Sequence, residues 1–395
     1  MGWSNQTLGD YCEVIAGQSP EGKYYNTDGQ GLPFYQGKKE FGDRFIGAPQ
    51  KWTTKVTKEA IDGDILMSVR APVGPINFST QKICIGRGLA SIRPSTKLNK
   101  DFLFYYLLSK QNEIVGNEGA VFASINKAQI EALSFSYVDI PEQKRIVALL
   151  DTVFADLEQT RAKTEQNLKN ARELFDSYLQ QVFSQKGEGW VETTLGAEIN
   201  LLTGFAFKSK EYVTHKNSTP LIRGDNIVQG KLRWDGVKLW SNDNISDYQK
   251  YQLEADDIVI AMDRTWVKAG MKFSKITPED LPALLVQRVA RLRALESINP
   301  DYLYHLVGSK LFESYVLSIQ TGLGVPHISG KQIQNFSFNK PDVEQQAILV
   351  SKMNNLKKEV SRLECIYQEK LNSIDELKKS ILQKAFSGEL TATAE

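Results

Sequence analysis

The sequence predicts an α+β fold in which two homologous globular domains are joined by two long antiparallel coiled-coil helices, with pseudo-twofold symmetry. Three observations lead to this prediction. The first half of the 395-residue chain recurs in the second half, each half ends in a long segment of helical periodicity, and the remaining residues alternate between strand-like and helix-like pieces. Internal self-similarity of this kind indicates repeated structural units.

A collinear series of matches carries the duplication. The matched pairs are GW at 2–3 with 189–190, TLG at 7–9 with 194–196, PFYQG at 33–37 with PLIRG at 220–224, DFLFYYLLSK at 101–110 with DYLYHLVGSK at 301–310, PEQKRI at 141–146 with VEQQAI at 343–348, and FS at 183–184 with 386–387. The offset is 187 for the first three pairs, grows to 200 at DFLFYYLLSK and reaches 203 at the last pair. Loops of different length in the two halves explain this growth.

The repeat divides the chain into four expected parts. They are a first globular domain at 1–139, a central spacer helix at 140–186, a second globular domain at 187–340 and a C-terminal spacer helix at 341–395. Within the domains, strand-like pieces such as DILMSVR at 64–70 and DIVIAM at 257–262 end in polar loops with Gly or Pro. Because such loops on a rigid scaffold commonly carry binding residues, they are the first place to look for a site.

Both spacer segments show apolar or small residues at steps of three and four, close to the 3.5-residue period of coiled coils. The predicted stripes are Ile146, Leu150, Val153, Leu157, Thr160, Thr164, Leu168, Ala171, Leu174, Tyr178 and Val182, and then Leu349, Met353, Leu356, Val360, Leu363, Tyr367, Ile374, Leu377 and Ile381. Asp342 followed by Gln345 resembles a capping box at the start of the second helix, and Gly388 is placed to end it. We expect the two helices to pair with each other; the alternative is that each packs on its own globular domain.

Composition excludes several classes of protein. No apolar run approaches the roughly 18–20 residues of a membrane span, and the N-terminus lacks the pattern of a signal peptide. The cysteines, Cys12, Cys84 and Cys365, are odd in number and far apart, which argues against a disulfide framework. We therefore expect a cytoplasmic protein. Since the net charge is only +1, any nucleic-acid binding must depend on local placement of charge.

The motifs of catalysis and cofactor binding are missing. GLPFYQGKK at 31–39 imitates a phosphate loop, but it has the wrong glycine spacing and Lys39 where Ser or Thr is required. His215, His305 and His327 are not at metal-ligand spacing from one another or from cysteines. The acidic group Glu254, Asp256 and Asp257 is interpreted as solvated turn residues at a strand entrance. The sequence thus predicts a chain with no enzymatic activity, cofactor or metal of its own.

Binding remains, and basic and amide side chains gather at the predicted loop ends. Arg and Lys suit guanine O6 and N7, Asn and Gln suit adenine N6 and N7, and basic side chains also hold phosphates. The candidate DNA-binding residues are Gln36, Lys38, Lys39, Arg44, Arg70, Asn77, Arg87, Arg93, Arg223, Asn226, Arg264, Lys268, Arg288, Arg291 and His327. For each of them the alternative is a solvated or salt-bridged surface group.

The order of these features resembles the specificity subunit of type I restriction–modification systems over the whole chain. The resemblance is carried by GW and TLG at the start of each half, GRGLASIRP at 86–94 with VQRVARLRA at 286–294, IPEQKRIVALLD at 140–151 and LQKAFSGEL at 382–390. It implies two target recognition domains, each recognising one half of an asymmetric bipartite DNA sequence, held apart by the coiled coil. It also implies two methylation subunits and motor–nuclease subunits as partners, and these would hold the S-adenosylmethionine, ATP and Mg²⁺.

Apolar spacer residues that helix pairing does not require are candidates for contact with partner subunits. They are Leu149, Phe154, Phe175, Ile348 and Ile366, which could instead widen the coiled-coil core. The alternative function is a coiled-coil scaffold whose globular domains bind other proteins. The near-neutral charge favours the scaffold, whereas the arginines at loop ends and the resemblance favour DNA recognition.

Overall fold

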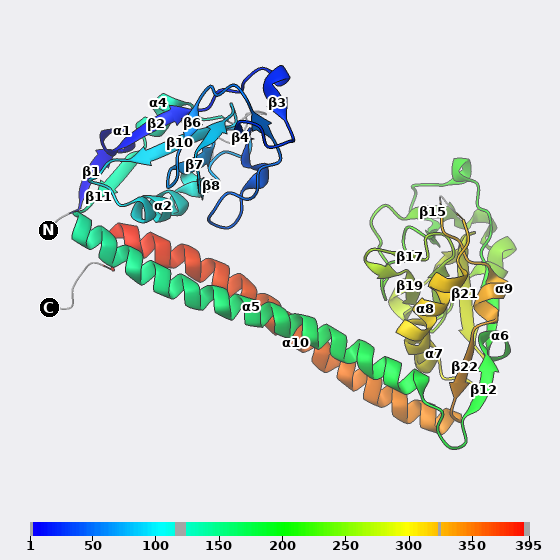
Figure 1. Ribbon diagram of the computed structural model, residues 1–395. Coiled ribbons are helices and arrows are strands. Elements are labelled where there is room, and N and C mark those ends of the chain that lie inside the picture. Colours follow the sequence, from blue (N-terminus) through cyan, green and yellow to red (C-terminus); the bar gives the residue numbers. More distant parts are fainter. Residues whose placement is uncertain (1–2, 115–123, 323–324, 391–395) are drawn as a thin grey trace. The chain divides into compact units, whose positions relative to one another are not determined.

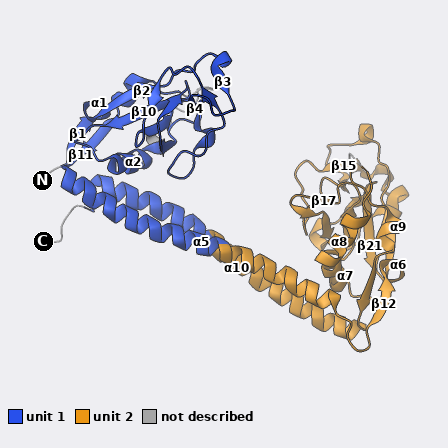
Figure 2. Cartoon of the chain, in the orientation of Figure 1, with its two compact units in different colours: residues 1–165, 369–395 blue, residues 166–368 orange. Residues whose placement is uncertain are grey.

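The computed structural model describes residues 3–114, 124–322 and 325–390. The chain divides into two compact units, which are coloured separately in Figure 2: unit 1 is Met1–Glu165 with Glu369–Glu395, and unit 2 is Gln166–Gln368. Each unit consists of one α+β domain and a pair of segments from the two long helices. The predicted fold class of two homologous α+β domains with two long antiparallel helices is confirmed.

The domain of unit 1 is built of short strands and helices, many of which are labelled in Figure 1. Its strands are β1 (Ser4–Thr7), β2 (Cys12–Ala16), β3 (Tyr25–Asn26), β4 (Leu32–Tyr35), β5 (Trp52–Thr53), β6 (Glu59–Ala60), β7 (Ile65–Ser68), β8 (Ile76–Phe78), β9 (Ile83–Ile85), β10 (Leu89–Pro94) and β11 (Ser134–Tyr137). Its helices are α1 (Leu8–Tyr11), η1 (Gly22–Tyr24), η2 (Lys38–Glu40), α2 (Lys100–Ser109), α3 (Gln111–Ile114) and α4 (Lys127–Glu131).

Unit 2 repeats this plan. Its strands are β12 (Val191–Thr194), β13 (Ile199–Thr203), β14 (Ser218–Ile222), β15 (Lys238–Ser241), β16 (Ile258–Ala261), β17 (Trp266–Val267), β18 (Gly270–Met271), β19 (Phe273–Lys275), β20 (Leu284–Leu285), β21 (Val289–Ala294) and β22 (Ser337–Lys340). Its helices are α6 (Leu195–Glu198), η3 (Ser209–Glu211), η4 (Asn242–Tyr251), η5 (Pro278–Asp280), α7 (Pro300–Val307), α8 (Lys310–Ile319) and α9 (Gly330–Gln334).

The sheets of the two units correspond strand by strand. An antiparallel sheet has the order β2-β10-β7-β8 in unit 1 and β13-β21-β16-β19 in unit 2. A second sheet contains a parallel pair, β4 with β9 and β14 with β20. All four residues of β7, and all four of β16, are buried, which explains why residues 65–67 and 258–261 are continuously apolar rather than alternating. The register is also shared, since Ile92 lies opposite Val14 and Leu292 lies opposite Leu201.

The long helices α5 (Ile140–Ser184) and α10 (Val343–Ser387) pair within each unit. In unit 1, Lys378 bonds Glu158 at 2.9 Å and Arg161 bonds Asp375. From the first pair to the second, the residue number rises by three on α5 and falls by three on α10, so the two helices are antiparallel. In unit 2, the Arg172 side chain bonds Glu364 at 2.7 Å. At the start of α10, Asp342 accepts a hydrogen bond from the Gln345 amide at 2.8 Å, and Gly388 has a φ of 88° just after the helix, as predicted.

The helices also contribute to the domain cores. They therefore pair with each other, as expected, and also pack on the globular domains, which was the alternative. Ile146, Leu150 and Phe386 belong to the hydrophobic core of unit 1, and Leu179 and Met353 belong to that of unit 2.

Two residues of the predicted stripe do not face a core. Leu174 and Leu377 are 51% and 48% exposed, so their assignment was wrong. A straight helix with 3.6 residues per turn drifts away from a strict 3.5-residue stripe.

A repeated glutamine explains the matched PEQ and VEQ motifs. Gln143 accepts a hydrogen bond from the Asn99 amide at 2.7 Å, and Gln346 accepts one from the Asn299 amide at 2.8 Å. Both glutamines are fully buried. Each one satisfies backbone groups where a long helix meets its domain, which is required because buried polar groups need hydrogen-bond partners.

A repeated ion pair joins an arginine of β10 or β21 to the aspartate that directly precedes the neighbouring strand, β7 or β16. Arg93 donates two hydrogen bonds to Asp64, both at 2.9 Å, and Arg293 donates two to Asp257, at 2.7 and 2.8 Å. Asp64 is 1% exposed and Asp257 is fully buried. The interpretation of Asp257 as a solvated turn residue was therefore wrong, because its carboxylate is the acceptor of a bidentate arginine pair.

Candidate nucleic-acid interface

In unit 1, backbone hydrogen bonds at the ends of β4, β7 and β9 hold several exposed side chains on one edge. The Gly86 amide donates to the Tyr35 carbonyl, the Gly88 amide to the Gln36 carbonyl, and the Val69 amide to the Gly88 carbonyl, at 2.8 to 3.0 Å. We call this edge rim 1 and define it as Gln18, Gln36, Arg70, Arg87, Gly88 and Ser124. All of these residues except the half-buried Gly88 are exposed.

Unit 2 builds the corresponding edge with counterparts of two of these bonds. The Val286 amide donates to the Ile222 carbonyl at 3.2 Å, and the Met262 amide donates to the Arg288 carbonyl at 2.8 Å. We call this edge rim 2 and define it as Phe205, Arg223, Asp263, Gln287, Arg288 and His327. The structure thus brings together three candidates predicted in unit 1, Gln36, Arg70 and Arg87, and three predicted in unit 2, Arg223, Arg288 and His327.

Rim 2 contains an acidic residue that organises two of its basic groups. Nδ1 of His327 lies 2.6 Å from Oδ1 of Asp263, and Nε of Arg288 lies 3.7 Å from the other carboxylate oxygen. Next to them, the amide of Arg264 donates to the Pro326 carbonyl at 2.7 Å. Arg264 and Arg288 have φ values of 48° and 67°, a conformation that is unfavourable for residues other than glycine. Backbone strain of this kind is concentrated at functional sites.

A half-buried lysine, Lys272, adds to the positive charge beside rim 2. Burial lowers the pKa of the Lys272 ammonium, and the nearby Arg233 and Arg264 lower it further, whereas Asp225 and Asp263 raise it. Several cations thus share two carboxylates, which leaves the surface attractive to an anion such as phosphate. The sequence prediction missed Lys272 and Arg233, because contacts between residues far apart in the sequence place them beside rim 2.

Two further predicted groups are accessible near the rims. Lys38 and Lys39 are exposed on η2, directly after Gly37, and Lys39 bonds the Gln50 side chain at 2.9 Å. Lys268 is exposed in the turn between β17 and β18. These lysines fit contacts to phosphates, which require charge and reach rather than a fixed geometry.

Three predicted arginines are occupied within the protein. Arg44 bonds Asp101 at 2.7 Å and Asp151 at 3.1 Å, and so ties its loop to α2 and α5. Arg93 is held by Asp64, as described above. Arg291 is only 7% exposed and donates to Asn200 at 2.6 Å. Their prediction as DNA contacts is corrected: each guanidinium is engaged or buried among protein groups.

Two predicted amides are buried as well. Asn77 is 1% exposed and exchanges hydrogen bonds with the backbone of Gly42, at 2.8 and 2.9 Å. Asn226 is 4% exposed, accepts from the Arg223 amide at 3.2 Å and donates to the Arg233 carbonyl at 3.1 Å. Neither amide can present its polar edge to a base. Asn226 acts instead by fixing the loop that carries Arg223 and Arg233.

The apolar candidates for partner contact also separate into two groups. Leu149, Ile348 and Ile366 are 37%, 53% and 45% exposed. Phe154 is buried with its ring 5.4 Å from that of Tyr105, and Phe175 is half-buried 5.9 Å from His305. For the two phenylalanines, packing against a domain replaces the predicted role at a partner surface.

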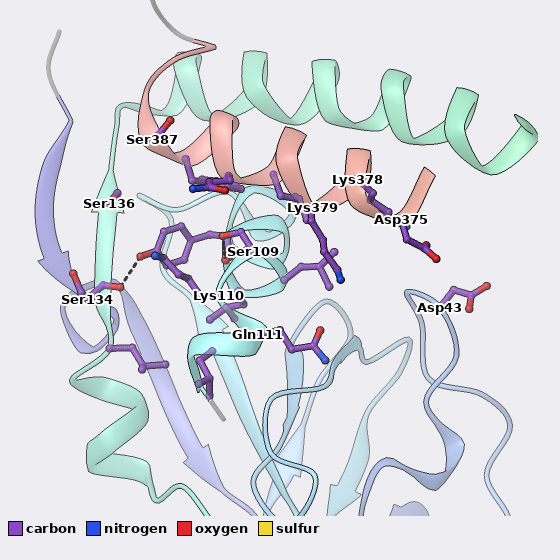
Figure 3. Close-up of a pocket in the computed structure, with 18 residues that line it drawn as sticks. Asp43, Ser109, Lys110, Gln111, Ser134, Ser136, Asp375, Lys378, Lys379 and Ser387 are labelled. Atoms are coloured by element: carbon purple, nitrogen blue, oxygen red, sulfur yellow. Dashed lines mark hydrogen bonds between the residues drawn. The ribbon is translucent and has the colours of Figure 1, made fainter. Parts of the chain in front are cut away.

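Unit 1 contains a groove of about 950 Å³ between the end of α2 and the last turns of α10. Figure 3 shows Lys378, Lys379 and Asp375 on α10 along one side of the groove, with Ser109 and Lys110 at the end of α2 below it and Asp43 on the side of Asp375. The hydroxyl of Tyr106 donates to the Ser134 carbonyl at 2.7 Å along its wall. No residue of rim 1 and no predicted site residue lines this groove, so it is distinct from the candidate interface.

Within the described residues, no three His, Cys, Asp or Glu side chains come together in a group able to hold a metal ion. In the same part of the chain, no helix combines the length and the apolar character needed to cross a membrane.

Comparison with known proteins identifies relatives of this chain. The family described as the type I restriction modification DNA specificity domain matches residues 1–168 and 187–372. The chain is 36% identical over 182 residues to the EcoAI specificity subunit of Escherichia coli, covering 45% of this chain and 30% of that protein. It is 24% identical over 405 residues to the MjaVIII specificity subunit of Methanocaldococcus jannaschii, covering 98% and 93%. Both are named as specificity subunits of type I restriction enzymes.

The lengths of these matches differ. With two relatives, at 40% and 36% identity, the chain spans only 40% and 30% of the relative's length. A solved chain of a type I R-M system has the same fold, with a TM-score of 0.79 at 18% identity over 98% of this chain and 97% of that one. Since the family matches almost all of both units, the chain belongs to the type I restriction modification DNA specificity family.

Proposed function

We propose that this chain recognises a bipartite, asymmetric sequence in double-stranded DNA and directs the methylation and restriction subunits of a type I restriction–modification complex to it. Rim 1 contacts one half of the sequence and rim 2 contacts the other. The observation that carries this proposal is the recurrence of one backbone arrangement, with exposed polar and basic side chains, at the same edge of both units. Two equivalent scaffolds with different side chains suit two different half-sites.

The division of roles follows from the chemistry of the side chains. Lysines and arginines around the rims hold the phosphates, which positions the protein on the duplex without selecting a sequence. Amide and guanidinium groups on the rims distinguish base edges in the major groove. The chain itself contributes recognition and no catalysis. We propose that two methylation subunits and motor–nuclease subunits supply S-adenosylmethionine, ATP and Mg²⁺ chemistry in the cytoplasm.

The exposed apolar residues of the long helices are proposed as contacts for the methylation subunits. Leu149 in unit 1, and Ile348 and Ile366 in unit 2, are the members of the predicted set that are exposed. Large apolar side chains on the surface of a charged helix are the usual centre of a protein interface.

The test of the proposal is methylation mapping of the full-length chain co-purified with the methylation subunits of its own system. We expect methylation at one split sequence in a pool of random duplexes. Arg264→Gln, which removes a positive charge beside rim 2, is expected to weaken methylation by about 5- to 150-fold, the range for loss of one good contact to DNA.

The matched control is Lys331→Gln, which removes a charge from the exposed surface of α9 in the same unit. It should leave methylation unchanged. If the wild-type complex methylated DNA with no sequence preference, or if the two variants behaved alike, the proposed function would be wrong.

A further inference from the structure

The two rims correspond position by position, because the same backbone hydrogen bonds define them. Gln18 and Phe205 each donate their amide to the last residue of the parallel strand, Ile85 and Leu285, at 3.0 Å. The carbonyls of Gly88 and Arg288 accept from Val69 and Met262 in the same way. The equivalent pairs are Gln18 with Phe205, Gln36 with Arg223, Arg70 with Asp263, Arg87 with Gln287, Gly88 with Arg288, and Ser124 with His327.

None of these six pairs has the same side chain in both units, although the backbone beneath them is shared. The buried neighbours behave differently: Ala90 matches Ala290 and Leu89 matches Val289, all of them buried. Chain folding therefore requires the residues beneath the rim to be similar, and places no such requirement on the rim itself. The variation is concentrated where a ligand would be contacted.

Two of the pairs exchange glutamine and arginine. Gln36 in unit 1 stands where Arg223 stands in unit 2, and Arg87 in unit 1 stands where Gln287 stands in unit 2. These are the two side chains that form bidentate hydrogen bonds with different purines, glutamine with adenine N6 and N7 and arginine with guanine O6 and N7. Exchanging glutamine and arginine would therefore change the purine that each position prefers.

The side chains are also available for this role. Among the described residues, the side chains of Gln36, Arg87 and Gln287 have no hydrogen-bond partner, and all three are exposed. The Arg223 guanidinium is half-exposed, with Nε 3.6 Å from Oδ1 of Asp225, a carboxylate that restricts its direction. Their backbones, in contrast, are fixed by the strand-end bonds. The backbone thus fixes the place of each side chain, and its donors and acceptors remain available for a base edge.

On the basis of the proposed function, we propose that these two pairs are specificity-determining positions of opposite preference. Gln36 selects adenine in the first half-site, and Arg223 selects guanine at the corresponding place in the second. Arg87 selects guanine in the first half-site, and Gln287 selects adenine in the second. Each half-site accordingly contains one adenine and one guanine contacted by these residues, with the two purines interchanged between the halves.

The experiment exchanges single residues in the full-length chain co-purified with its methylation subunits, and maps methylation of a random duplex pool. Gln36→Arg is expected to convert one adenine of the first half-site into guanine, with a change in preference of about 5- to 150-fold, while the second half-site stays unchanged. Arg223→Gln is expected to convert one guanine of the second half-site into adenine, while the first stays unchanged.

Gln81→Arg is the matched control, since it introduces the same side chain at an exposed position of unit 1 in the turn between β8 and β9. It should leave both half-sites as they are. Absence of any sequence preference in the wild-type complex would refute the proposed function itself. A specific wild-type complex whose half-sites are unaltered by both exchanges, or whose affinity falls equally for all sequences, would overturn only the assignment of these positions.

Discussion

Units 1 and 2 are the same in their supporting interactions and different in their exposed edges. Both have a buried glutamine that joins a long helix to its domain, and both have an aspartate–arginine pair that joins two strands of the antiparallel sheet. Between these shared parts the loops diverge. Unit 2, for example, has an aromatic cluster of Phe207, Trp240 and Tyr248 around η4.

The comparison indicates which residues can differ between the two copies of a duplicated domain without loss of stability. Removing one partner of a buried ion pair leaves an uncompensated charge, which is strongly destabilising. A substitution on an exposed edge usually changes stability by no more than about 0.5 kcal/mol. Stability therefore restrains the ion pair and the glutamine, whereas the rims can differ at little cost to folding.

The largest expected effect comes from breaking the shared ion pair in one unit only. Asp257→Ala leaves Arg293 without its bidentate acceptor, and we expect unit 2 to lose about 3–5 kcal/mol of unfolding free energy. Asp64→Ala should cost unit 1 a similar amount, because its carboxylate is equally buried. Urea unfolding followed by limited proteolysis, with fragments assigned by mass to each unit, measures the two effects separately.

Asp256→Asn serves as the control for this comparison, since Asp256 is exposed, its side chain pairs with Lys275 at 3.0 Å and asparagine tolerates its φ of 69°. A loss below about 1 kcal/mol for both buried aspartates would place them among ordinary surface ion pairs. The two units would then owe their similarity to something other than this pair.

Much of the fold could be predicted from the sequence because periodicity and repetition are local signals. The matched GW, TLG and PEQ segments indicated the duplication, and the apolar spacing indicated both long helices. The exceptions, Leu174 and Leu377, lie where strict 3.5-residue spacing leaves the contact surface. Helix geometry beyond a few turns depends on the partner helix, which a single sequence does not specify.

The candidate site was harder to predict because residue type does not reveal burial. Arg44, Asn77 and Arg291 have suitable side chains, but protein groups occupy or cover them. Lys272 and Arg233 lie near rim 2 through contacts between distant loops, which no spacing in the sequence indicates. The positions that the repeat alignment marks, such as Gln36 and Arg223, are exposed or half-exposed at the rims.

A smaller effect should come from Asp263, whose equivalent in unit 1 is Arg70. Asp263→Asn removes the charge that holds His327 and Arg288, so both side chains gain freedom. On the proposed function, we expect base preference at one position of the second half-site to weaken by about tenfold, or about 1.4 kcal/mol. The first half-site should be unaffected. Methylation of duplexes substituted one position at a time measures this difference.

Asp256→Asn is the control, because asparagine tolerates its φ of 69° and the residue lies outside rim 2. If Asp263→Asn lowered the stability of unit 2 and left every base preference intact, Asp263 would be a structural residue only. The contrast between the rims would then rest on the other five pairs.

The smallest expected difference is in the response of the two units to pH. His305 in unit 2 is 2% exposed and contacts Asn354 at 2.7 Å, whereas the equivalent residue in unit 1 is Tyr105. Burial lowers the pKa of His305 below its usual value, with the nearby Lys357 acting in the same direction. The unfolded chain therefore binds the proton more readily than the folded one. The contribution of neutral His305 to the free energy of unfolding is fully present above the pKa of about 6.5 in the unfolded chain. It is lost as the pH falls toward the lower pKa in the folded chain.

Between pH 7 and pH 5 we thus expect unit 2 to become less stable relative to unit 1, by at most about 1.4 kcal/mol for each unit of pKa difference. The tyrosine in unit 1 does not titrate in this range, since burial raises the pKa of Tyr105. His305→Tyr copies the unit 1 residue into unit 2 and should remove the difference. Urea midpoints for each unit at both pH values test this. An equal fall in both units, unchanged by the substitution, would assign the pH dependence to carboxylates common to the two and not to His305.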